Sequence, residues 1–156
     1  MSSLCLLDLD HTLIYGSYAP SENVELLFQY NRYLKVYKRP YVNDFISFLN
    51  ETYDTIIVYT TAKEDYAIKI CNKLNVRTTM ILSRSHCIQK NENYYKKFSK
   101  DWGSSYKSIH IIDDSPNVWL KTEPFENKID FIIPREFRGE VEDKELLGIM
   151  SYVKSY

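Results

Sequence analysis

Cysteine, glycine, long apolar runs and an excess of either charge are all scarce in this chain of 156 residues. Its three cysteines, Cys5, Cys71 and Cys87, are odd in number and form no Cys-x-x-Cys pair. This pattern argues against a disulfide framework or a zinc site and favours a reducing compartment, cytoplasmic or nuclear. The apolar run near the N-terminus stops at Asp8, so it is too short for a secretory signal or a membrane span.

The charge balance excludes another class of partner. Lysine and arginine number 20 against 21 aspartate and glutamate residues, which leaves a formal net charge of −1. Because no long run of like charge stands out, we expect no direct binding of nucleic acid; the short N-terminal apolar run gives the separate expectation of no membrane association. The length fits a single domain over residues 1–156. The 14 tyrosines, against four glycines, are compatible with a core edge or with a binding surface.

Short apolar segments alternate with amphipathic ones. Residues 4–7, 54–60, 108–113 and 131–133 are mostly apolar and predict buried strands, with a further short strand at 80–82. Three helices are predicted by apolar residues that recur one turn apart. These residues are Val42, Phe45, Ile46 and Leu49; Ala67, Ile70, Cys71 and Leu74; and Leu146, Ile149, Met150 and Val153. The alternation predicts an α/β fold, a Rossmann-like parallel sheet flanked by helices.

Residues 12–37 interrupt this alternation directly after the first predicted strand. They contain turn formers and scattered aromatic residues, which predict a small flap or irregular hairpin inserted into the fold.

Polar residues follow three of the predicted strands. The first strand runs into residues 8–12 (Asp-Leu-Asp-His-Thr), the second into 60–61 (Thr-Thr) and the third into 113–115 (Asp-Asp-Ser). Ligands of open parallel sheets bind beyond the carboxyl ends of the strands, so neighbouring strands would bring four carboxylates together. Such a cluster needs a proton or a cation, and Mg²⁺ with oxygen ligands suits it. The alternative for any single cluster is a helix cap or a turn.

Residues 8–13 (Asp-Leu-Asp-His-Thr-Leu) are similar to the Asp-x-Asp-x-Thr motif of the haloacid dehalogenase superfamily. Within that superfamily, the chain resembles the phosphatases that act on the C-terminal domain of RNA polymerase II, also called NLI-interacting-factor-like or small CTD phosphatases. The resemblance extends over most of the chain and implies the fold of that superfamily. Further similar segments are residues 36–40 with Phe45, 58–62 with Tyr66, 84–87, 93–96, 112–116 and 143–147.

The resemblance implies a Mg²⁺-dependent phosphatase and a role for each acidic residue. Asp8 is the implied nucleophile that forms an aspartyl-phosphate, and Asp10 is the implied general acid and base. The implied Mg²⁺ ligands are Asp8, the backbone carbonyl of Asp10, and Asp114. Asp113 is expected to orient Lys96 or a metal-bound water, although the two adjacent aspartates could exchange roles.

Three further residues are implied to bind the phosphate: Thr60, Thr61 and Lys96. The Lys96 cation would offset charge that develops at phosphorus, while Thr12 would brace the loop. From residue type alone, Lys96 is a solvated lysine, because Lys97 lies beside it and lysines are mostly exposed.

The resemblance also implies the substrate, a phosphoserine or phosphothreonine in a protein or peptide. Tyr18 in the flap and Tyr66 after the second strand match positions that flank the peptide in the polymerase-directed members. The alternative for both is a tyrosine at a surface edge. Asp114 departs from the family pattern, which often has Asn there. Two other functions stay open: a small-molecule or nucleotide phosphatase, and a catalytically idle domain that binds a peptide.

Overall fold

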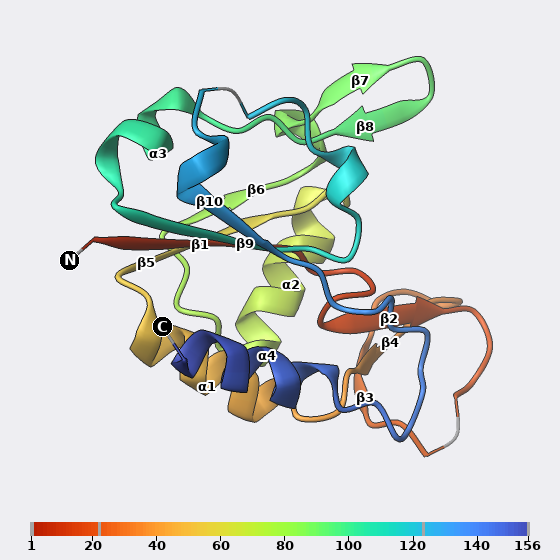
Figure 1. Ribbon diagram of the computed structural model, residues 1–156. Coiled ribbons are helices and arrows are strands. Elements are labelled where there is room, and N and C mark those ends of the chain that lie inside the picture. The colour runs from red at the N-terminus through yellow and green to blue at the C-terminus, as the bar shows by residue number, and fades with distance from the viewer. Residues whose placement is uncertain (1, 22, 123, 156) are drawn as a thin grey trace.

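The computed structural model describes residues 2–21, 23–122 and 124–155 and is built on a five-stranded parallel sheet (Figure 1). The strand order is β10-β9-β1-β5-β6. The bounds are β1 Ser3–Leu7, β5 Thr55–Tyr59, β6 Met80–Leu82, β9 Ser108–Ile112 and β10 Ile129–Ile132. The predicted α/β fold class is therefore confirmed. The last strand begins earlier than predicted and ends before Ile133, which is 54% exposed.

Strand β1 lies at the centre of the sheet, between β9 and β5, and its apolar residues are buried on both faces. Leu6 pairs with Ile57 of β5 on one side and with Ile111 of β9 on the other. Since side chains alternate along a strand, Leu4 and Leu6 join one apolar cluster while Cys5 and Leu7 join the other. This arrangement confirms that the three strands expected to carry the polar ends are neighbours.

Helices cover both faces of the sheet (Figure 1). On one face lie α1 (Val42–Thr52), α2 (Glu64–Leu74) and α4 (Glu145–Lys154), and their predicted apolar residues are buried there. The other face is covered by aromatic side chains and by the short helix α3 (Lys100–Ser105), which the sequence did not predict. Among the described residues, none of the helices has the length and apolar character needed to cross a bilayer.

The insert after β1 is more regular than the predicted irregular hairpin. It forms a three-stranded antiparallel sheet, hereafter the flap, in the order β2-β4-β3. The strands are β2 Ile14–Ser17, β3 Leu26–Gln29 and β4 Lys35–Lys38. A second small sheet, unpredicted, is the hairpin of β7 (Ile88–Lys90) and β8 (Asn93–Tyr95). Asn91 allows its tight turn by adopting a positive φ of 59°.

Arg39, between the flap and α1, ties the loop after β1 to the C-terminal segment. Its side chain is fully buried and forms a two-pronged ion pair with Asp143, at 2.8 Å from each guanidinium nitrogen involved. The same guanidinium donates to the backbone carbonyls of Thr12 and Arg135 at 3.0 and 2.7 Å. This single side chain therefore fixes the loop that carries the first acidic motif.

We expect Arg39→Met to lower the free energy of unfolding by about 3–5 kcal/mol, since it leaves the Asp143 carboxylate buried without its partner. Urea unfolding would measure the loss. Arg138→Met is the matched control, because the Arg138–Glu136 pair is 65% and 42% exposed and such pairs contribute at most about 1 kcal/mol. Equal losses in the two variants would show that the buried pair does not brace the fold.

Candidate active site

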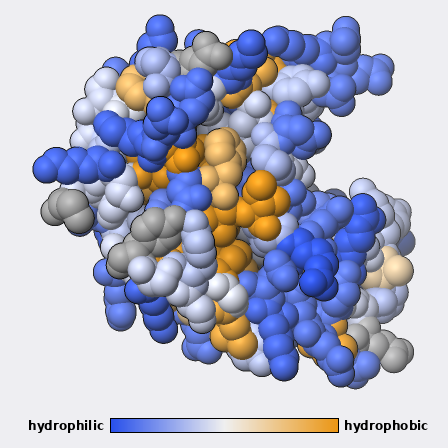
Figure 2. Space-filling view, viewed as in Figure 1, coloured by the Kyte–Doolittle hydropathy of each residue, from blue (hydrophilic) through white to orange (hydrophobic). Residues whose placement is uncertain are grey.

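The carboxyl ends of β1, β5 and β9 meet at a cleft of about 110 Å³. Figure 2 shows that the molecule is hollowed on the side toward which these strands run, between the β7–β8 hairpin and the flap. All the predicted site residues except Thr12, Tyr18 and Tyr66 line the cleft. The lining residues are Asp8, Asp10, His11, Thr60, Thr61, Lys96, Asp113, Asp114, Ser115 and Val118.

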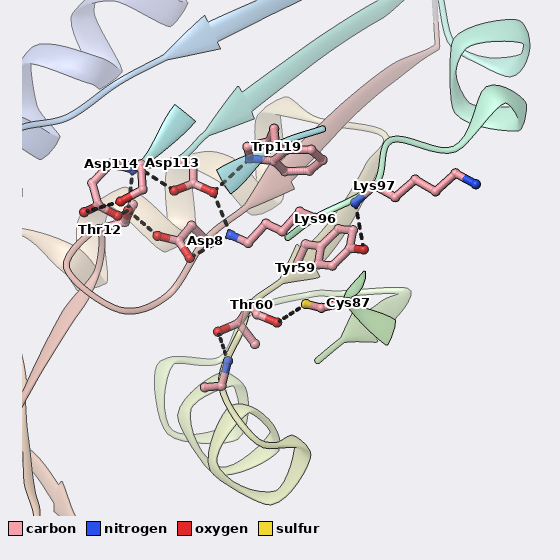
Figure 3. A network of polar contacts seen from close by, with 12 residues as sticks. Asp8, Thr12, Tyr59, Thr60, Cys87, Lys96, Lys97, Asp113, Asp114 and Trp119 are labelled. Atoms are coloured by element: carbon pink, nitrogen blue, oxygen red, sulfur yellow. Dashed lines mark hydrogen bonds and ion pairs between the residues drawn. The ribbon is translucent and has the colours of Figure 1, made fainter. Parts of the chain in front are cut away.

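Asp8 and Lys96 form the centre of the site (Figure 3). Asp8 directly follows β1, and its backbone N–H continues the sheet by donating to the carbonyl of Ile112 at 3.0 Å. The Lys96 ammonium lies 3.0 Å from Oδ1 of Asp8 and 2.6 Å from Oδ2 of Asp113. One cation thus holds two carboxylates that come from the ends of adjacent strands.

Lys96 is buried because its backbone is fixed on both sides. Its N–H donates to the carbonyl of Val118, and its carbonyl accepts from Leu120, at 2.8 and 2.9 Å. The ammonium also lies 5.9 and 5.7 Å from the ring centroids of Tyr59 and Trp119, within range of cation–π attraction. The side chain is consequently only 2% exposed, contrary to what its residue type alone predicts.

The two adjacent aspartates have different surroundings. Both oxygens of Asp113 accept bonds from groups other than Lys96: the indole N–H of Trp119 donates to Oδ2 at 2.9 Å and the Ser115 N–H to Oδ1 at 2.9 Å. Asp114 is less buried, and its carboxylate contacts the hydroxyls of Ser115 and Thr12, each at 3.2 Å. Because hydroxyls can rotate away, Asp114 is the better placed of the two to accept a metal ion.

Thr12 links the first acidic motif to the last. Its hydroxyl oxygen lies 2.8 Å from Oδ2 of Asp8 and accepts the backbone N–H of Asp114 at 3.1 Å. The side chain is fully buried, and it therefore sets the distance between the two acidic segments, as a bracing residue would.

Burial raises the pKa of both central carboxylates, because the charged form loses its hydration. The pKa of Asp8 rises to about 6 through burial, against the lowering effect of Lys96. The pKa of Asp113 also rises to about 6, through burial and then through the charge of Asp8. Burial by itself would lower the pKa of Lys96, but Asp8 and Asp113 outweigh it and raise this pKa above its usual value.

The donor set suits a hard divalent cation. One carboxylate oxygen each from Asp8, Asp113 and Asp114 lies within 4.8 Å of the others. Three ionised carboxylates against the single Lys96 ammonium leave a net charge of −2, which a divalent ion would neutralise. Carboxylate oxygens beside an open cleft match Mg²⁺, which retains several waters. The residues present therefore fit the metal that the resemblance implies.

Asp10 lies in the tight turn that follows β1 rather than on an extended strand. The turn is closed by a backbone bond from Leu13 to Leu9 at 2.8 Å, and His11 adopts a positive φ of 64°. Burial raises the pKa of Asp10, while a hydrogen bond from Tyr66 lowers it. Asp10 thus faces the same cleft as Asp8, but from the turn.

The two threonines after β5 and the two tyrosines occupy different parts of the site. Thr60 is buried and its hydroxyl oxygen accepts the Ala62 N–H at 3.1 Å, so the hydroxyl proton is available to a group in the cleft. Thr61 also lines the cleft. Tyr66 donates a hydrogen bond to Asp10, whereas Tyr18 is 80% exposed and does not line the cleft. The peptide contacts expected of both tyrosines stay predictions.

Trp119 is one residue of the site that sequence reasoning missed. It follows β9 by several residues and combines an indole N–H bonded to Asp113 with a ring beside the Lys96 ammonium. A tryptophan shortly after the second acidic motif was the available signal. Its role depends on a backbone bridge to Lys96 that residue spacing does not reveal.

The family model for NLI interacting factor-like phosphatases matches residues 3–156. A relative from Dictyostelium discoideum, "CTD small phosphatase-like protein 2", is 32% identical over 96% of this chain and 26% of its own length. "CTD small phosphatase-like protein 3" of Caenorhabditis elegans is 30% identical over 96% of this chain and 53% of its own. The chain therefore spans between about a quarter and a half of these relatives.

A solved structure, described as Fcp1, an essential RNA polymerase II CTD phosphatase, shares the fold. Its TM-score is 0.68 at 16% identity, over 99% of this chain and 61% of that one. At this identity the likeness concerns the arrangement of the sheet and helices.

Proposed function

The chain belongs to the NLI interacting factor-like phosphatase family, and from this premise we propose that residues 1–156 form one phosphatase domain acting through an aspartyl-phosphate at Asp8. The observation that carries the proposal is the Asp8 carboxylate, buried at the cleft between the Lys96 ammonium and the Thr12 hydroxyl. These two contacts fix the orientation of a nucleophile that must attack in line. The assignment of Asp8, Asp10, Thr60, Lys96 and Asp113 as catalytic rests on the same proposal.

In the first step a carboxylate oxygen of Asp8 attacks phosphorus, and the bond from phosphorus to the ester oxygen breaks. Asp10 gives its proton to the leaving oxygen. Lys96, held by Asp8 and Asp113 at 3.0 and 2.6 Å, offsets negative charge on the phosphoryl oxygens, and Thr60 and Thr61 donate hydrogen bonds to them.

In the second step water attacks the phosphorus of the phosphorylated Asp8, and the bond to the Asp8 oxygen breaks. Asp10, now ionised, accepts the proton of that water. Inorganic phosphate leaves, and the carboxylate of Asp8 and the acid form of Asp10 are restored. One residue can serve both steps because each needs a proton transfer at the same face of the phosphoryl group.

Mg²⁺ would be held by Asp8, the backbone carbonyl of Asp10, and Asp114. When bound, it supplies positive charge that orients the phosphate and neutralises its oxygens. Asp113 fits the other role, orienting Lys96, because both of its oxygens are already engaged.

The substrate we favour is phosphoserine or phosphothreonine in a protein or peptide. The Dictyostelium and Caenorhabditis relatives are named as CTD small phosphatase-like proteins, and the open cleft between hairpin and flap suits an extended chain (Figure 2). An intracellular location, cytoplasmic or nuclear, fits such a substrate and the three free cysteines. A small-molecule or nucleotide phosphatase is the second candidate. The residues that line the cleft would contact the phosphate group, which peptides, sugar phosphates and nucleotides all carry.

We expect phosphoserine peptides to be hydrolysed with a kcat/KM at least roughly tenfold above that of sugar phosphates and nucleotides, because peptide contacts outside the phosphate add binding in the transition state. Phosphate release from a substrate panel with Mg²⁺ measures this. Nucleotides or sugar phosphates that equal the peptides would favour the second candidate, and no hydrolysis of any ester would favour an idle peptide-binding domain.

A further inference from the structure

Tyr66 contacts the reaction centre from a direction that the sequence did not predict. It lies in the first turn of α2, is only 7% exposed, and its hydroxyl donates to Oδ1 of Asp10 at 3.0 Å. The ring thus lies within the protein, and the atom nearest the chemistry is its hydroxyl oxygen.

Two residues of the flap, Tyr30 and Gly16, lie against this tyrosine. Tyr30, which follows β3, packs edge-on against the Tyr66 ring with 5.1 Å between the centroids. The Tyr30 hydroxyl donates to Asp65 of α2 at 2.7 Å. Gly16 of β2 comes so close to the hydroxyl that an added Cβ would stand 3.2 Å from its oxygen. The position of that hydroxyl is therefore determined jointly by α2 and the flap.

The hydrogen bond from Tyr66 makes the two carboxyl oxygens of Asp10 unequal, because only Oδ1 accepts it. The Tyr66 hydroxyl, placed by α2 and the flap, donates its hydrogen bond to Oδ1 of Asp10 at 3.0 Å. This bond engages Oδ1 as an acceptor, which leaves Oδ2 to carry the proton that Asp10 exchanges. The carboxyl group also loses freedom to rotate, which a general acid at the end of a turn would otherwise retain.

We propose that Tyr66 is a positioning residue for proton transfer, orienting Asp10 so that Oδ2 delivers the proton to the leaving oxygen. The proposal rests on the proposed role of Asp10 as general acid. It differs from the expected peptide contact, because a positioning role acts on every substrate according to how much its leaving group needs a proton.

The test is Tyr66→Phe, which keeps the ring and removes the hydroxyl, assayed on small aryl phosphates without any peptide. We expect kcat/KM for p-nitrophenyl phosphate, whose leaving group needs little protonation, to stay within about twofold of wild type. For phenyl and p-methylphenyl phosphate, which have more basic leaving groups, kcat/KM should fall by about tenfold, which corresponds to about 1.4 kcal/mol. The plot of log kcat/KM against leaving-group pKa should therefore be steeper in the variant.

Two further variants make the result decisive. Tyr106→Phe is the matched control, since it also removes a half-buried hydroxyl, bonded at 3.2 Å to Thr55 at the amino end of β5, the end opposite the cleft; its plot should have the wild-type slope. Asp10→Asn is the reference and should steepen the plot more than Tyr66→Phe does. An unchanged slope in Asp10→Asn would overturn the proposed function and this inference with it. A steeper slope in Asp10→Asn, with a uniform loss or none in Tyr66→Phe, would overturn the positioning role alone.

Discussion

Asp8→Asn is expected to lower turnover to less than about a hundredth of the wild-type rate, with the fold preserved. An amide oxygen is a poor nucleophile, so no aspartyl-phosphate forms, although the side chain keeps nearly the same shape. The fold should tolerate the change because Lys96 retains Asp113, at 2.6 Å, as its charged partner. Phosphate release under saturating substrate, with thermal unfolding in parallel, measures both parts of the prediction.

The matched control for Asp8→Asn is Asp101→Asn, which makes the same chemical change in the first turn of α3, on an exposed side chain. It should retain wild-type turnover. In the wild-type protein, a phosphate adduct on the peptide containing Asp8 should be detected by mass spectrometry after rapid acid quenching, and it should be missing from Asp8→Asn. If that variant kept more than about a hundredth of the rate, or the adduct appeared on another residue, the nucleophile would have been assigned wrongly.

The central sheet could be predicted because its strands are buried on both faces. β1, β5 and β9 are nearly continuous apolar runs, and acidic or hydroxyl residues end them at one edge of the sheet. The convergence of Asp8, Thr60 and Asp113 on one cleft follows from that arrangement alone. The same reasoning could not detect α3 or the β7–β8 hairpin, since both are short and carry mixed polar sequences without a clear period.

Lys96 illustrates where local sequence stops being informative. Lys96 and Lys97 are adjacent lysines, yet the first is buried among carboxylates and aromatic rings while the second is exposed (Figure 3). The difference arises from the backbone pairing of Lys96 with the segment around Trp119, 23 residues further along the chain. Only the resemblance to a phosphatase family singled out this lysine before its surroundings were known.

Contacts between distant segments account for the other features that the sequence did not disclose. Arg39 and Asp143 are separated by 104 residues, and Tyr66 and Asp10 by 56. Each residue is unremarkable among its neighbours in sequence, and each acquires its role only when helix, flap and loop pack together. Periodicity and turn chemistry report on local structure, so they identify the elements and leave such pairs undetermined.

Removal of divalent metal is expected to abolish hydrolysis, and Mg²⁺ is expected to restore it. Asp8, Asp113 and Asp114 carry more negative charge than Lys96 alone neutralises, and a phosphate dianion would add to it. Without a cation, the anionic substrate is repelled by the residue that has to attack it. Dialysis against EDTA followed by phosphate-release assays should show at least about a hundredfold loss.

Replacement of the metal distinguishes a catalytic requirement from mere charge neutralisation. Ca²⁺ carries the same charge as Mg²⁺ but takes more ligands at longer and less regular distances. It should therefore bind the carboxylates and inhibit in the presence of Mg²⁺, because in-line attack by Asp8 tolerates little change in the position of phosphorus. Circular dichroism of the EDTA-treated protein should retain the wild-type spectrum, since Lys96 still links Asp8 to Asp113. Full activity in chelator would exclude the metal-dependent mechanism, and equal activity with Ca²⁺ would show that charge alone suffices.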